Sequence, residues 1–70
     1  MLNSIEHYKE LGRKAAQAMN HRDISLYGHF RDLFSRGKAL EKEQYKASTQ
    51  AAYDSGFSET RTVITVERFK

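Results

Sequence analysis

The sequence predicts a mainly α-helical fold, namely an antiparallel hairpin of two helices with a long second helix and a short C-terminal β-strand. Apolar residues recur at helical spacing over residues 4–19 and again over residues 24–55. No proline interrupts either segment. β-Branched residues cluster over residues 61–68, where they favour a strand. A chain of 70 residues is expected to form a single domain, residues 1–70.

The first helix is predicted over residues 4–19. Asn3 is suited to cap its start, and Glu6 completes a capping-box pattern. Asn20 is suited to the left-handed conformation that often ends a helix. On a helical wheel, the residues that share the apolar face are Ile5, Tyr8, Leu11, Gly12, Ala15, Ala16 and Met19.

The second helix is predicted as one long element over residues 24–55, capped by Asp23 at its start and by Gly56 at its end. Gly37 is a potential break, but the apolar pattern keeps its phase through it. The residues that share one arc of the continuous wheel are Phe30, Leu33, Phe34, Gly37, Leu40, Gln44, Ala47, Ser48, Ala51 and Ala52. We therefore expect Gly37 to allow close approach of another helix, with or without a kink.

These two helices differ in length, and the strand over residues 61–68 has no second strand beside it in the sequence. The shorter helix is expected to cover only the N-terminal half of the longer one, with Phe30, Leu33, Phe34 and Leu40 meeting Leu11, Tyr8 and Ile5. The C-terminal half of the longer helix carries small residues. They are expected either to pack against a second copy of the chain or to form a solvated helix end. The strand is expected to pair with a copy, to join the sheet of another protein, to lie disordered as a tail, or to pack along the helix.

The sequence shows no pattern typical of a catalytic or cofactor site, so we predict a protein that is not an enzyme and takes no metal or cofactor. Its three histidines lack metal-ligand spacing, and there is no cysteine. Its glycines are isolated rather than gathered in a phosphate-binding loop. The expected function is therefore binding of another macromolecule.

A mild basic excess keeps nucleic acid open as an alternative partner. Twelve basic and nine acidic residues give a net charge of +3. Basic side chains in a row neutralise phosphates, and tyrosines beside them stack on bases. The residues predicted for this alternative site are Arg31, Lys38, Lys42, Lys46, Tyr45 and Tyr53. A plain solvated helix face accounts for the same pattern.

The leading hypothesis is a small protein-interaction module of the adaptor or inhibitor type, dimeric and cytoplasmic. The segment MLNSIEHYKE is not a secretory signal, and no apolar run is long enough to span a membrane. Stand-alone proteins of this size often act as inhibitors or adaptors, including those carried by phages and plasmids, so an accessory protein of a phage or mobile element is one expectation. The residues expected to bind a protein partner are Val63, Ile64, Val66, Phe69, Ala47, Ala51, Ala52 and Phe57. A purely structural homo-oligomer is a further alternative.

Overall fold

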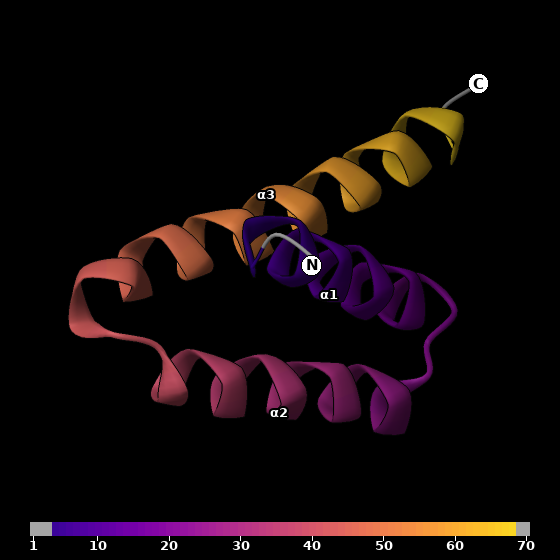
Figure 1. Ribbon diagram of the computed structural model, residues 1–70. Coiled ribbons are helices and arrows are strands. Elements are labelled where there is room, and N and C mark those ends of the chain that lie inside the picture. Colours follow the sequence, from indigo (N-terminus) through magenta and orange to yellow (C-terminus); the bar gives the residue numbers. More distant parts are fainter. Residues whose placement is uncertain (1–3, 69–70) are drawn as a thin grey trace.

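The computed structural model describes residues 4–68, and the side chains within residues 5–61. Over this range the chain forms a bundle of three helices, α1 (Ser4–Asn20), α2 (Ile24–Leu40) and α3 (Glu43–Arg68). Figure 1 shows α2 running back beside α1, while α3 crosses α1 and its C-terminal turns project beyond the other two helices. The chain is mainly helical as expected, but the predicted hairpin with one long second helix is wrong.

The first helix and the start of the second agree closely with the prediction from the sequence. α1 ends one residue later than predicted, at Asn20. The left-handed residue of the turn is Arg22, with φ of 60°, rather than Asn20. Asp23 caps α2 as predicted, because its carboxylate accepts a hydrogen bond of 3.0 Å from the backbone N–H of Leu26. The predicted cap at Asn3 lies outside the described residues.

The long helix expected over residues 24–55 is broken at Glu41 and Lys42. Glu41 adopts an extended conformation (φ −77°, ψ 154°), and its N–H donates to the Lys38 carbonyl at 3.1 Å. This two-residue connection turns the chain so that α3 packs along α1, which is the main interhelical contact among the described residues. Gly37 does not break α2. The continuous apolar phase across this region therefore did not indicate a continuous helix.

The strand predicted over residues 61–68 is also wrong, because α3 continues as a helix to Arg68. The difference in helix propensity between a β-branched residue and alanine is only about 0.7 kcal/mol or less. A helix satisfies its backbone hydrogen-bonding groups within one segment, whereas an isolated strand leaves them unpaired. No strand occurs anywhere within residues 4–68.

The core lies where α1 meets both other helices. Its buried members are Tyr8, Leu11, Ala15, Phe34, Ala52 and Tyr53, with Tyr27, Phe30 and Phe57 partly buried against them. The rings of Phe34 and Tyr53 stack with centroids 4.1 Å apart. Gly37 receives the ring of Tyr8, since a Cβ at Gly37 would lie 2.9 Å from the Tyr8 hydroxyl. Gly37 therefore accommodates a side chain of α1 rather than the close approach of another helix that was expected there.

Two glycines set the crossing of α1 and α3. A Cβ on Gly12 would overlap the carbonyl oxygen of Tyr53, and a Cβ on Gly56 would overlap that of Lys9. Gly56 is therefore an interior residue of α3 and not the C-terminal cap that its sequence context suggests. The two helix backbones touch at this crossing, which leaves little room between them for side chains.

Candidate functional site

Three leucines of α2 face away from the core and form what we call the leucine face (Leu26, Leu33 and Leu40). Their exposed fractions are 42%, 40% and 88%. They recur every seven residues and so lie along one side of the helix. Phe34, which follows Leu33 and lies about 100° further around the helix, occupies the core instead. The leucine face is therefore apolar surface that the described part of the chain leaves uncovered.

A groove of about 430 Å³ between α1 and α2 adjoins one end of the leucine face. We call it the α1–α2 groove. It is lined by Lys14, Gln17, Ala18, His21, Asp23, Leu26 and Phe30. Leu26 belongs both to the groove and to the leucine face, so the two features form one continuous surface. An apolar side chain from another molecule could enter here against Leu26 and Phe30.

One ion pair flanks the leucine face near its middle. The Arg36 guanidinium lies 3.1 Å from the Asp32 carboxylate, one helical turn away, and both side chains are more than half exposed. A pair this exposed adds about 0.3–0.5 kcal/mol at most to the helix. The ion pair places one positive and one negative group beside Leu33.

Residues predicted to bind a protein partner are divided between the surface and the core. Ala47 and Ala51 are exposed, whereas Ala52 is buried in the core. Phe57 is partly buried, with its ring centroid 6.1 Å from that of Tyr27 and 6.2 Å from that of Tyr53. The break before α3 resets the helical phase, so that α3 buries the side of Ala52 and leaves that of Ala47 and Ala51 in solvent.

Four further predicted partner residues belong to the C-terminal segment. The side chains of Val63, Ile64 and Val66 lie outside the described side chains, and Phe69 lies outside the described residues altogether. The backbone of the first three is helical.

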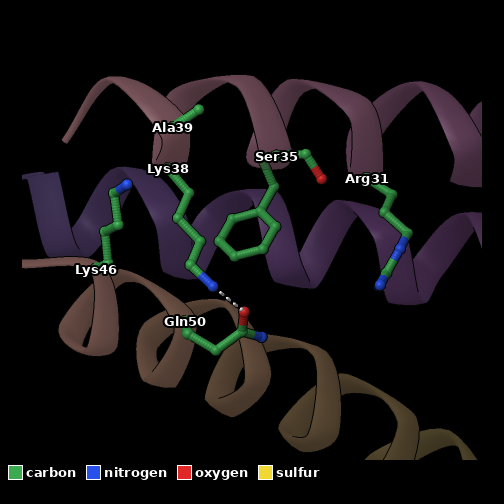
Figure 2. A pocket seen from close by; sticks show the side chains of 7 residues that line it. Arg31, Ser35, Lys38, Ala39, Lys46 and Gln50 are labelled. Carbon is green, nitrogen blue, oxygen red and sulfur yellow. Dashed lines mark hydrogen bonds between the residues drawn. The ribbon is translucent and has the colours of Figure 1, made fainter. Parts of the chain in front are cut away.

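Three of the four cations predicted for the nucleic-acid site line a second groove, between α2 and α3. This basic groove has a volume of about 340 Å³ and is lined by Arg31, Phe34, Ser35, Lys38, Ala39, Lys46 and Gln50 (Figure 2). The Lys38 ammonium donates to the Gln50 side-chain oxygen at 2.8 Å, and it lies 6.0 Å from the centre of the Phe34 ring. The Lys46 ammonium lies 3.2 Å from the Glu43 carboxylate. The cations thus come from two helices rather than from one helical stripe.

The remaining residues of that predicted site are placed differently. Tyr45 is half exposed, and Lys42 lies in the connection between α2 and α3. Tyr53 is only 3% exposed, so its ring is not available to stack on a base. Burial raises the pKa of Tyr53, Tyr27 adds to this, and the neighbouring Arg31 guanidinium opposes it. Arg31 therefore acts on the buried Tyr53 hydroxyl and also lines the basic groove.

The leucine face was not predicted, although the sequence holds its signal. Leu26, Leu33 and Leu40 are spaced by seven, while the aromatic residues of the same helix follow a different line. Leu33 and Leu40 were expected in the intrachain core, because a single long helix would have needed them there. Their exposure follows from the break at Glu41, which lets α3 supply the core from the other side.

The described residues contain neither a metal site nor a membrane-spanning helix. Within residues 4–68 no group of three or more His, Cys, Asp or Glu side chains is arranged to hold a metal ion. In the same range, no helix combines the length and the apolar character needed to cross a bilayer.

Comparison with known proteins gives no relative for this chain. No protein-family model matches it, and no curated protein or solved structure shows significant similarity to it.

Proposed function

We propose that this chain is a non-enzymatic protein-interaction module that binds a partner through the leucine face of α2. The observation that carries the proposal is the exposure of three leucines at heptad spacing, including 88% for Leu40. Full burial of a leucine side chain is worth about 1.5–3 kcal/mol. Covering this row therefore supplies a substantial part of the free energy of a specific complex.

The leucine face differs from the surface expected from the sequence, but it suits the same class of function. An adaptor or inhibitor that acts through one helix needs an apolar row on one side of that helix, with polar groups beside it. α2 has this arrangement, since Asp32 and Arg36 flank the leucines. The lack of cysteine suits a reducing compartment such as the cytoplasm.

A site-specific photo-crosslinker placed at Leu33 tests the proposal in cells. We expect discrete crosslinked products at this position. A matched crosslinker at Ser55, which is exposed on α3, should give none. The products should disappear when Leu26 and Leu40 are both replaced by Glu. Equal labelling from both positions, or no product from Leu33, would contradict the proposal.

The second candidate function is binding of a nucleic-acid backbone in the basic groove. The observation that favours it is that Arg31, Lys38 and Lys46 line one groove although they come from two helices. Three cations within one groove can neutralise successive phosphates of a single strand. Glu43 and Asp54 lie close enough to reduce the local field, through their contacts with Lys46 and Gln50.

Fluorescence anisotropy with a single-stranded oligonucleotide tests this second candidate across a salt series. Each phosphate contact adds about 0.7 to the slope of log affinity against log salt for a single strand. The double variant K38E/K46E should lower affinity and flatten the slope by about 1.4. The control R13E/K14E changes the net charge equally but leaves the groove intact, so a similar loss there would exclude the groove.

A further inference from the structure

Leu40 and the α1–α2 groove lie at opposite ends of the leucine face. Leu40 is the most exposed of the three leucines and stands at the C-terminal end of α2. The groove lies at the N-terminal end, where Leu26 and Phe30 form part of its lining. One end of the surface thus presents a projecting side chain and the other presents a recess.

Leu33 is the midpoint between these two ends. It lies seven residues, or about 10.5 Å along the axis, from both Leu26 and Leu40. We propose that two copies of the chain pair antiparallel through α2, about a two-fold axis at Leu33, so that Leu40 of each copy enters the α1–α2 groove of the other. This inference rests on the proposed function, because it names the occupant of the leucine face.

The flanking charges are complementary in this arrangement. A two-fold axis at Leu33 places residue n of one copy opposite residue 66 − n of the other, and it puts the same flank of both helices on the same side. Asp32 of one copy then lies within two residues, about 3 Å along the axis, of the position opposite Arg36 of the other. The ion pair now formed within each helix, at 3.1 Å, can therefore extend to two pairs between the copies.

A parallel pairing would lose both kinds of complementarity. It would place Leu40 beside Leu40 of the second copy, and it would put Arg36 and Asp32 of the two copies on opposite flanks of the interface. The α1–α2 groove of each copy would then receive no leucine. Seven-residue spacing of the leucines suits helices that cross at a small left-handed angle, which holds for the antiparallel pair as well. The recess and the charges together select the antiparallel partner.

Disulfide trapping in the full chain tests the proposal, since the natural sequence has no cysteine to interfere. Under mild oxidation L33C should form a covalent dimer, because position 33 lies on the two-fold axis. L26C is the matched control, with an equivalent exposure in the structure. The L26C variant alone should not form a covalent dimer, since the two copies of position 26 would lie about 21 Å apart along the helix axis. When L26C is mixed with the L40C variant, a disulfide should form between position 26 of one copy and position 40 of the other, with Leu33 still in place in both.

Each other outcome overturns the antiparallel dimer. Equal linking of L33C and L26C indicates a parallel pair or random collision, and linking of neither indicates that the leucine faces do not meet. The photo-crosslinker at Leu33 then separates this failure from failure of the proposed function. Crosslinked products that contain a different protein would show that the leucine face binds that protein instead of a second copy. The absence of any product would contradict both the interaction module and the dimer.

Discussion

Gly12 and Gly56 are the residues at which α1 and α3 come closest. Each faces a backbone carbonyl of the other helix, from Tyr53 and Lys9 respectively, with no space for a methyl group. The sequence places Gly12 correctly on the apolar face of α1. It does not show that Gly56 is interior, because a glycine after a run of helical residues is equally typical of a C-terminal cap. Only the partner helix distinguishes the two roles.

The substitution G12A should destabilise the fold by about 1–3 kcal/mol, because the added methyl group forces the crossing apart. Urea unfolding followed by circular dichroism measures this change. The control is G28A, at an exposed helical position with no atom within 4 Å of the new Cβ. G28A should stabilise the protein by about 0.5–1 kcal/mol. A G12A protein as stable as the natural one would show that the crossing is not tight.

Two buried tyrosines make the free energy of unfolding depend on pH in the alkaline range. Burial raises the pKa of Tyr8, and its hydrogen bond of 3.0 Å to Glu41 adds to this. Burial likewise raises the pKa of Tyr53. A raised pKa in the folded state means that this state holds the phenolic proton more tightly. The tyrosines therefore contribute stability below their unfolded pKa of about 10, and this contribution is lost as pH rises through the folded values.

Unfolding free energies measured from pH 8 to pH 11 should fall above about pH 10. The variant Y8F, which cannot ionise, should show a shallower fall than the natural protein. A Y45F variant serves as the control, since Tyr45 is half exposed and lies outside the core. A fall of the same steepness in Y8F would contradict the role given to Tyr8.

At the scale of the elements, α2 is held mainly by α1 and only lightly by α3. Its start depends on the Asp23 cap, which the sequence predicts correctly from residue type and position. Its end does not follow from the sequence. The apolar phase continues from Phe34 to Ala51, yet the chain turns at Glu41, because the turn lets α3 bury a side that includes Thr49 and Tyr53 against α1.

The substitution D23A should cost about 1 kcal/mol, since it leaves the backbone N–H of Leu26 without its side-chain acceptor. Thermal unfolding of the natural chain and the variant measures the difference. D23N is the control, because asparagine caps helices about as well as aspartate. If D23N loses as much stability as D23A, the effect arises from charge rather than from the cap.

For the whole molecule, the central feature is a three-helix bundle that covers the aromatic side of α2 and leaves the leucine face exposed. The sequence predicts the need for a partner, but from a long helix and a solitary strand that do not form. The leucine face emerges only once the break at Glu41 is known, because that break decides which residues α3 brings to the core. The seven-residue spacing shows that the three leucines share one side of a helix, but it does not show whether α1 or α3 covers that side.

Sedimentation velocity of the full chain over a concentration series tests the account most directly. The leucine face, paired with a second copy, predicts a mass that rises with concentration from 8.1 kDa toward twice that value. The variant L33E should stay at 8.1 kDa with unchanged helix content, because Leu33 lies outside the core. A natural chain that remains at 8.1 kDa at every concentration would contradict the dimer. If its Leu33 also crosslinks to no other protein, the leucine face is not an interaction surface.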